Sequence, residues 1–212
     1  MSPGASMPPG SSKPIVSWGV CGQSIPGETE SGDLHVVAHF TDGVLVAVID
    51  GLGHGPGAAS AARAAAHVLE EFADEPVMPL VRRCHEALRG TRGVVLSVAA
   101  FSAGDNTMTW LGVGNVEGVL FRADTATVPR REGLLLRGGV VGYQLPPLRP
   151  TTLPVVLGDM LVFATDGIRS HFADESPIGC DPDPAAQSIH AHFGKVTDDS
   201  LVLVARYEGR PS

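Results

Sequence analysis

Short hydrophobic runs dominate the chain and predict a protein built mainly from β-strands. Most of the runs are rich in Val, Leu and Phe, and most are bounded by Gly, Asp, Asn or Pro, residues that favour turns. The predicted strands are Ile15–Cys21, Leu34–Phe40, Val44–Asp50, Val94–Phe101, Thr107–Gly114, Gly118–Arg122, Met160–Thr165 and Leu201–Tyr207. Thr41-Asp42-Gly43 and Gly104-Asp105-Asn106 are typical of tight turns between consecutive strands, which favours antiparallel pairing.

Three segments instead carry apolar residues at helical spacing. They are Pro56–Asp74, Pro79–Arg89 and Pro184–Phe193. The first is rich in Ala and begins with Pro, a residue that suits the first turn of a helix. The strands come in groups, with helices between the groups rather than after every strand. This order predicts a layered α+β fold and not a doubly wound parallel sheet.

The length of 212 residues fits one domain with a substantial core. Its first 14 residues, MSPGASMPPGSSKP, contain neither the basic region nor the apolar region of a signal peptide. We therefore expect a disordered Pro/Gly/Ser leader over residues 1–14 and a single domain over residues 15–212.

Charge and cysteine content exclude several classes of protein. The net charge is −8 with no basic block, which argues against a nucleic-acid partner or an anionic membrane surface. No apolar run is long enough to span a membrane. The three cysteines are widely spaced and form no CxxC pair, so neither a disulfide framework nor a structural zinc site is expected. We expect a cytoplasmic protein.

The candidate chemistry lies where acidic residues meet strand ends. The predicted strand Val44–Asp50 ends in Asp50-Gly51, and Met160–Thr165 runs into Asp166-Gly167. Asp33 stands just before one predicted strand, and Asp198-Asp199 stands just before another. Four carboxylates at the ends of neighbouring strands repel one another at neutral pH, and such a cluster persists mainly when cations neutralise it. Hard oxygen ligands suit Mg²⁺ or Mn²⁺ better than zinc.

A dinucleotide site is a competing interpretation of the same region. Gly53-x-Gly55-x-x-Ala58 satisfies the G-x-G-x-x-G/A pattern after a strand and before a helix. The acidic residue expected about 20 positions later would be Glu70 or Glu71. Both of these lie within the predicted helix instead of at the end of a second strand, which argues against this interpretation.

Three motifs resemble those of the metal-dependent PPM protein serine/threonine phosphatases: Asp50-Gly51, Ala164-Thr165-Asp166-Gly167 and Asp198-Asp199-Ser200-Leu201-Val202-Leu203-Val204. The string Asp50-Gly-Leu-Gly-His-Gly, with Glu30-Ser-Gly-Asp33 before it and Gly112-Val-Gly-Asn115 after it, is most similar to the small bacterial SpoIIE and RsbX-type branch. The resemblance covers about residues 15 to 207. It implies a four-layer αββα sandwich of two mostly antiparallel sheets flanked by helices.

The resemblance also implies a metal site for two Mn²⁺ or Mg²⁺ ions. In that arrangement Asp50 bridges both ions, and the Gly51 carbonyl binds one of them. Asp166 and Asp198 hold the second ion, while Asp33 completes the first directly or through water. Asp199 remains an alternative to Asp198, because adjacent acids leave the register open.

The implied reaction is hydrolysis of phosphoserine or phosphothreonine by a water that the two ions activate, with Asp50 and Asp166 as catalytic residues. His54 is the local candidate for the general acid that protonates the leaving alkoxide. It stands two positions later than the His of larger members, and a helix-capping role is the competing interpretation. No Arg precedes Arg63, so we expect the substrate phosphate to be held mostly by the metals.

The expected substrates, also by resemblance, are phosphorylated STAS-domain proteins of the stressosome, and we expect a monomer. The alternative is a catalytically silent relative, a phosphatase-like interaction module that binds the same partners. The presence of all four carboxylates argues against a silent relative, because a degenerate site usually loses one of its ligands.

Overall fold

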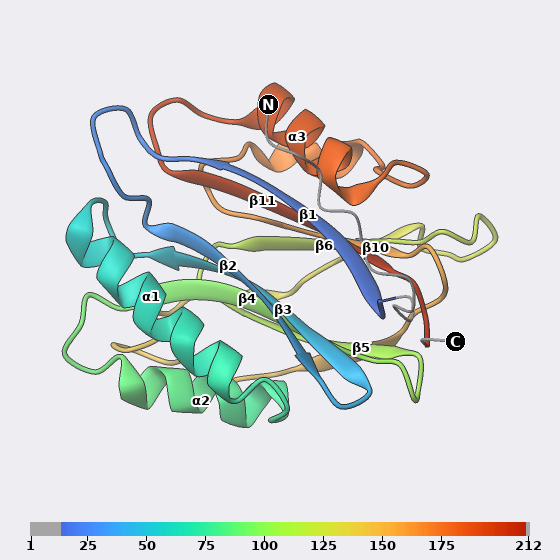
Figure 1. The fold of residues 1–212 in the computed structure, drawn as a ribbon, viewed down its shortest axis with the longest axis horizontal. Coiled ribbons are helices and arrows are strands. Elements are labelled where there is room, and N and C mark those ends of the chain that lie inside the picture. The colour runs from blue at the N-terminus through green and yellow to red at the C-terminus, as the bar shows by residue number, and fades with distance from the viewer. Residues whose placement is uncertain (1–13, 211–212) are drawn as a thin grey trace, which may run out of the picture.

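The computed structural model describes residues 14–210 and arranges them in two β-sheets packed face to face (Figure 1). The two sheets, called sheet A and sheet B, contain strands from both halves of the chain. In spatial order, sheet A consists of β1 (Val16–Gln23), β11 (Ser200–Tyr207), β10 (Met160–Ala164), β6 (Glu117–Phe121) and β7 (Arg131–Gly133). Sheet B consists of β2 (Asp33–Phe40), β3 (Gly43–Gly51), β4 (Val94–Ser102), β5 (Thr107–Val113) and β8 (Leu136–Arg137), with β9 (Thr151–Pro154) also pairing with β5. All pairs are antiparallel except β5 with β8.

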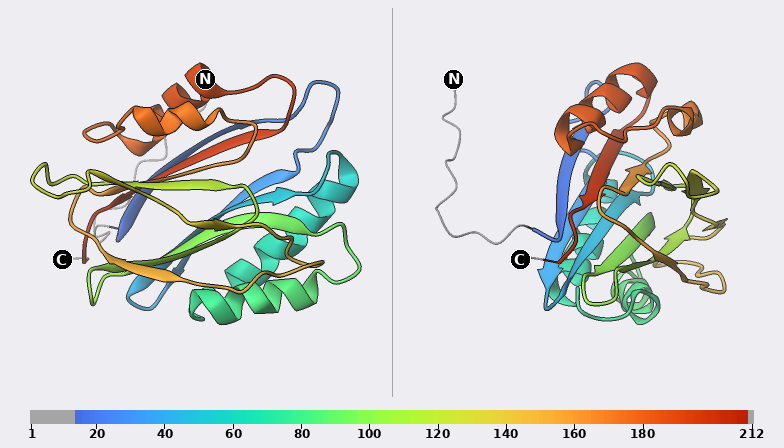
Figure 2. Two further views of the ribbon diagram at one scale, coloured as in Figure 1. Left: turned by 180° about the vertical axis from the view of Figure 1, so that it is seen from behind. Right: turned by 90° about the vertical axis from the view of Figure 1, so that its right-hand side faces the viewer.

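Helices cover the outer face of each sheet (Figure 2). Helices α1 (Pro56–Glu71) and α2 (Val77–Ala87) lie on sheet B, whereas α3 (Pro182–Phe193) lies on sheet A beside the short 3₁₀ helix η1 (Ser170–Asp174). The expected four-layer αββα sandwich is therefore confirmed. The predicted leader, residues 1–14, lies outside the described residues except for its last position.

Strand β3 explains how the layers are held together. It is buried along nearly its whole length, and its side chains alternate between two hydrophobic cores. Leu45 and Ile49 pack toward the helices on sheet B, whereas Val46 and Val48 pack toward sheet A. Because both of its faces are covered, the strand is continuously apolar, unlike a strand with one face in water.

All eight predicted strands and all three predicted helices are present, with shifted ends. Helix α1 ends at Glu71 instead of Asp74, and α3 begins at Pro182 instead of Pro184. Strands β7, β8 and β9 and helix η1 were not predicted. The three missed strands have two to four residues, and none is fully buried, so their side chains show no hydrophobic alternation.

The connection from β3 through α1 and α2 returns the chain to β4, which is antiparallel to β3. A dinucleotide-binding unit needs two parallel strands joined by a helix, so this connection excludes the dinucleotide interpretation of the glycine-rich turn. Within residues 14–210, none of the helices is both long enough and apolar enough to cross a membrane.

Candidate active site

Sheet B contributes the first pair of acidic residues. Asp33 begins β2 and lies directly opposite Asp50 near the end of β3, so both side chains leave the same face of the sheet. Gly51 ends β3, and its amide donates a hydrogen bond to the carbonyl of Gly32 over 3.0 Å. A Cβ at Gly51 would lie only 2.3 Å from the Ala58 carbonyl oxygen, so helix α1 approaches too closely for any larger residue.

Sheet A contributes the second pair. Asp166 follows β10, and Asp198 and Asp199 precede β11, the strand next to β10 in the sheet. The loop that carries Asp166 lies flat against the segment before β11, because a Cβ at Gly167 would be 1.9 Å from the Asp199 carbonyl oxygen. The glycines that follow Asp50 and Asp166 therefore allow close packing on both sides of the site.

The two sheets meet at a cavity of about 260 Å³ that holds three of the predicted ligands. It is lined by Asp50, Leu52, Gly53, His54, Val95, Asn115, Asp166 and Asp198. The Asn115 side-chain amide donates a 2.8 Å hydrogen bond to an Asp166 carboxylate oxygen and so orients that carboxylate. We call this space the carboxylate cavity.

Asp33 is buried next to Asp50 but does not line the carboxylate cavity. Its side chain accepts a 2.7 Å hydrogen bond from the Thr165 hydroxyl and borders a separate cavity of about 250 Å³. The Thr165 hydroxyl in turn accepts a hydrogen bond from the Leu201 amide. Asp33 is thus linked to the Asp166 loop through one side chain.

The structure separates the two adjacent acids whose register the sequence left open. Asp199 is buried, and its two carboxylate oxygens accept hydrogen bonds from the amides of Ile25, over 2.8 Å, and Gly32, over 2.7 Å. Asp198 is exposed and lines the carboxylate cavity. Asp199 therefore fastens the loop between β1 and β2, and Asp198 is the acid available to a ligand.

The cavity strongly disfavours negative charge. Burial, together with the charges of Asp33, Asp166 and Asp198, raises the pKa of Asp50 to about 8. Burial also raises the pKa of Asp33 to about 7, although the Thr165 hydrogen bond opposes this shift. The pKa of Asp166 is raised by burial and by Asp198, against the effects of Lys195 and Asn115. Carboxylates whose ionised forms are destabilised in this way are stabilised by a bound cation.

The carboxylate oxygens of the cavity are of the kind that binds a hard divalent cation, but they do not yet converge on one point. Asp50, Asp166 and Asp198 present carboxylate oxygens to one cavity, and these are the ligands that Mg²⁺ and Mn²⁺ prefer. Among residues 14–210, however, no three His, Cys, Asp or Glu side chains converge closely enough to form a metal site as they stand.

His54 lies at the exposed rim of the carboxylate cavity. Its Nδ1 atom is 2.8 Å from a carboxylate oxygen of Glu28, so the imidazole is held by an acidic partner. It makes no side-chain hydrogen bond that caps helix α1, whose cap position is Gly55. Glu28 was not predicted as a site residue, because it lies 26 positions from His54 and outside the Glu30-Ser-Gly-Asp33 motif.

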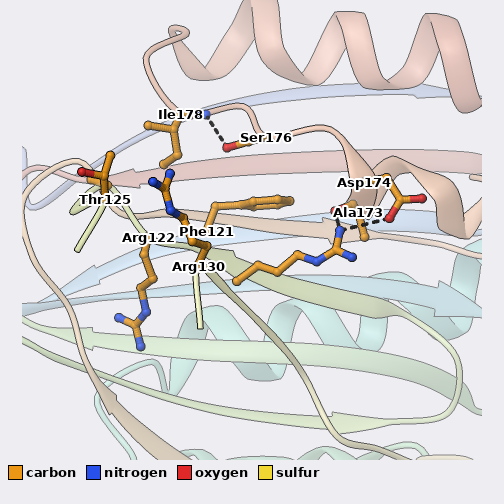
Figure 3. A pocket seen from close by; sticks show the side chains of 10 residues that line it. Phe121, Arg122, Thr125, Arg130, Ala173, Asp174, Ser176 and Ile178 are labelled. Carbon is orange, nitrogen blue, oxygen red and sulfur yellow. Dashed lines mark hydrogen bonds and ion pairs between the residues drawn. The ribbon is translucent and has the colours of Figure 1, made fainter. Parts of the chain in front are cut away.

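A second pocket, shown in Figure 3, has a different character. It has a volume of about 370 Å³ and lies between the β6–β7 hairpin and residues 173–178. Arg122 is buried there and forms ion pairs with Asp159 and Glu132. Arg131 is paired with Asp174, while Arg130 has no ion pair within the described chain. We call this space the arginine pocket.

Comparison with known proteins identifies the family. Residues 41–208 match the family described as Stage II sporulation protein E (SpoIIE), so the chain belongs to the SpoIIE family of PP2C-type phosphatase domains. Within it the chain is RsbX-like. It is 30% identical over 94 residues to phosphoserine phosphatase RsbX of Bacillus subtilis (strain 168), a match that covers 44% of this chain and 47% of that protein. The alignment thus spans about half the length of this curated relative.

Solved structures extend the similarity to nearly the whole chain. A chain from a study of the bacterial stressosome is 26% identical, with a TM-score of 0.80, over 90% of this chain and 99% of that one. RsbX in complex with magnesium is 20% identical, with a TM-score of 0.79, over 90% of this chain and 94% of that one. The PP2C domain of Bacillus subtilis SpoIIE is 18% identical, with a TM-score of 0.75, over 93% and 64% of the two chains. The last two likenesses establish the fold.

Proposed function

We propose that the protein is a phosphoprotein phosphatase that hydrolyses phosphoserine or phosphothreonine with the help of divalent metal ions. One observation carries this proposal. Acidic side chains from both sheets, Asp50, Asp166 and Asp198, line a single open cavity in a member of the SpoIIE family. The raised pKa values of Asp50 and Asp166 indicate that the cavity is built to be neutralised by cations.

The residues have separate roles in metal binding. Asp50 lies between the two halves of the site and would bind both of two Mn²⁺ or Mg²⁺ ions. The Gly51 carbonyl and Asp33 would bind one of these ions. Asp166 and Asp198 would hold the other ion. When bound, such ions acidify water for attack on phosphorus and neutralise charge on the phosphoryl oxygens.

The remaining residues position groups and move a proton. Asn115 fixes the orientation of the Asp166 carboxylate through its 2.8 Å hydrogen bond. His54, when protonated, donates its proton to the serine or threonine alkoxide as the leaving group departs. The carboxylate of Glu28 orients the imidazole ring through its 2.8 Å contact with Nδ1. Nε2 is then the atom that can face the leaving group.

Phosphorylated STAS-domain proteins of the stressosome are the substrates we propose, with the enzyme acting as a cytoplasmic monomer. Two findings support this choice. RsbX is a phosphoserine phosphatase by name, and the structural neighbour with a TM-score of 0.80 comes from a stressosome study.

The decisive experiment measures hydrolysis of p-nitrophenyl phosphate and of a phosphoserine protein, with Mn²⁺ and then with excess EDTA. We expect turnover that requires Mn²⁺ and is lost with the chelator. Asp166→Asn is the matched inactive variant, and Asp105→Asn, in the exposed turn between β4 and β5, is its control.

The competing function is a silent interaction module with the same fold. It predicts no turnover of either substrate, while Mn²⁺ still raises the melting temperature. Indifference to Mn²⁺ in both assays would contradict the carboxylate site itself.

A further inference from the structure

Arg92 packs against the glycine-rich turn that borders the carboxylate cavity. It comes from the loop between α2 and β4, and its Nη1 atom donates a 3.4 Å hydrogen bond to the His54 carbonyl oxygen. A Cβ at Gly57 would lie 2.7 Å from Arg92 Nε, so the guanidinium packs directly against the turn. A Cβ at Gly53, which lines the cavity, would lie 3.2 Å from Arg92 Nη1. Arg92 is therefore at the mouth of the cavity.

Lys195 lies on the sheet A side of the carboxylate cavity, in contact with the lining residue Asp166. It lies between α3 and β11, and its backbone amide donates a 2.8 Å hydrogen bond to the Gly167 carbonyl oxygen. Its ammonium group donates to the carbonyl oxygen of Asp166, the residue on the sheet A side of the cavity. Burial and the charge of Asp198 raise the pKa of Asp166, and the positive charge of Lys195 opposes this rise.

Both cations lack an anionic hydrogen-bond partner. Within residues 14–210, no carboxylate lies within ion-pair distance of Arg92 or Lys195, and each donates only to a backbone carbonyl oxygen. This contrasts with Arg122 and Arg131 of the arginine pocket, whose charges are paired with acids of the chain itself. Arg92 and Lys195 are exposed and have no acidic partner in the described chain, although the protein has a net charge of −8. Both side chains therefore keep N–H donors for hydrogen bonds that an external anion can accept.

We propose, on the basis of the phosphatase function above, that Arg92 and Lys195 bind anionic oxygens of the substrate at the mouth of the carboxylate cavity. A guanidinium can bind two oxygens of a phosphoryl group or carboxylate at once, and an ammonium supplies a compact second charge. The two residues flank the entrance, so they select phosphoproteins whose phosphorylated residue has acidic neighbours.

The test uses two phosphoserine peptides that differ only in their flanks, one with Asp and one with Ala on either side. Initial rates with Mn²⁺ are measured for the wild type, Arg92→Ala, Lys195→Gln, the double variant and the conservative Arg92→Lys. Arg82→Ala, an exposed arginine on α2 away from the cavity, is the matched control. Melting temperatures report whether each variant is folded.

We expect Arg92→Ala and Lys195→Gln each to lower kcat/KM for the Asp-flanked peptide about 10-fold, mainly through a higher KM. Arg92→Lys should recover part of the loss, Arg82→Ala should match the wild type, and the differences should shrink as salt is raised. An equal loss on both peptides means that the cations bind the phosphoryl oxygens and contradicts the selection for acidic neighbours. A loss confined to the Asp-flanked peptide means that they bind the flanking carboxylates.

Wild-type kcat/KM on both peptides in the double variant would overturn the proposal. So would a loss that is independent of salt and is matched by a lower melting temperature, since that outcome marks a purely structural role. If the wild type hydrolyses neither peptide, the phosphatase function is wrong. The cation proposal is then judged by fluorescence anisotropy of the same labelled peptides, whose binding the double variant must weaken.

Discussion

The carboxylate cavity and the arginine pocket are both charged, but their charges are arranged in opposite ways. In the arginine pocket, Arg122 is 7% exposed in its side chain and forms ion pairs with Asp159, which is fully buried, and with Glu132. In the carboxylate cavity, Asp50 and Asp166 face other acids, and their pKa values rise. The first arrangement pairs opposite charges within the chain, whereas the second leaves like charges side by side, as expected for the proposed metal site.

This difference separates structural charge from functional charge. Buried ions that already have partners fix the packing of the chain, and removing one partner leaves the other buried without compensation. A group of like charges instead costs stability and is retained where it serves a ligand. The pocket with the larger volume is therefore not the better candidate for catalysis.

The largest effect is expected for Asp50→Asn. Loss of the bridging carboxylate should lower kcat for phosphoserine hydrolysis about 1000-fold, because the metal ions supply several kcal/mol of transition-state stabilisation. The same variant should melt no lower than the wild type in EDTA at pH 8, because it removes one of several mutually repelling charges. Near-native turnover would contradict the assignment of Asp50 as a metal ligand. A much lower melting temperature would show that Asp50 stabilises the fold, as Arg122 does.

The second largest effect is expected for Arg122→Ala, measured as stability. Its removal leaves the buried Asp159 with hydrogen bonds from the amides of Ala123 and Val156 only. We expect a loss of about 3 kcal/mol, or a melting temperature lower by about 6–12 °C for a chain of this size. Arg130→Ala is the matched control, since it lines the same pocket without an ion pair in the described chain. Equal losses of stability in both variants would show that the ion pairs of Arg122 do not stabilise the fold.

His54→Gln tests the imidazole at the rim of the carboxylate cavity, which has the carboxylate of Glu28 as its partner. As general acid, His54 should contribute about 100-fold to the hydrolysis of phosphoserine. It should contribute little to the hydrolysis of p-nitrophenyl phosphate, because nitrophenolate leaves readily without a proton. Rates for the two substrates should therefore diverge in His54→Gln and in Glu28→Gln. If both substrates slow equally, His54 has another role.

The smallest effect concerns pH in the absence of metal. An acid whose pKa is higher in the folded than in the unfolded state binds more protons when folded, so stability falls as pH rises between the two values. For Asp33 and Asp50 this interval runs from about 4 to about 7 and about 8. In EDTA we expect the melting temperature to fall from pH 5 to pH 8.5 by about 3–6 °C, which corresponds to about 1–2 kcal/mol.

Saturating Mg²⁺ should remove this dependence, because a bound cation stabilises the ionised carboxylates. Asp50→Asn should also show a weaker fall in EDTA. A wild-type melting temperature that rises with pH between 5 and 8.5 would contradict the electrostatic account of the cavity.

The sequence was sufficient to predict the layers of the fold and the presence of Asp50 and Asp166 at one site, whereas Asp33, predicted with them, borders a separate cavity. Asp50 lies near the end of the apolar strand β3, Asp166 follows β10 and Asp198 precedes β11, so the pattern of apolar runs placed all three at strand ends. The order of strands and helices then predicted the antiparallel layers. Strands β7 to β9 escaped prediction because their short segments pair at sheet edges without a buried face.

The sequence was not sufficient for choices that depend on contacts between distant loops. Asp198 and Asp199 differ only because amides of the β1–β2 loop, at Ile25 and Gly32, take both oxygens of Asp199. Arg92 and Lys195 are ordinary loop residues in the sequence. Their positions at the cavity mouth follow from the packing of loops that lie far apart along the chain.

The two halves of the site belong to different sheets, and this division has a mechanical consequence. At the opposite end of the sandwich, the Tyr207 hydroxyl of sheet A donates a 2.8 Å hydrogen bond to Asn106, in the β4–β5 turn, and the Tyr207 ring stacks on Phe101 of sheet B. The sheets are thus joined at one end by this hydrogen bond and ring contact, whereas at the cavity end the Thr165–Asp33 hydrogen bond is opposed by repulsion among the acids. A bound cation would neutralise the repulsion at the cavity end and make both ends of the sandwich rigid. Slower amide exchange should then extend inward from the cavity along β3 and β11.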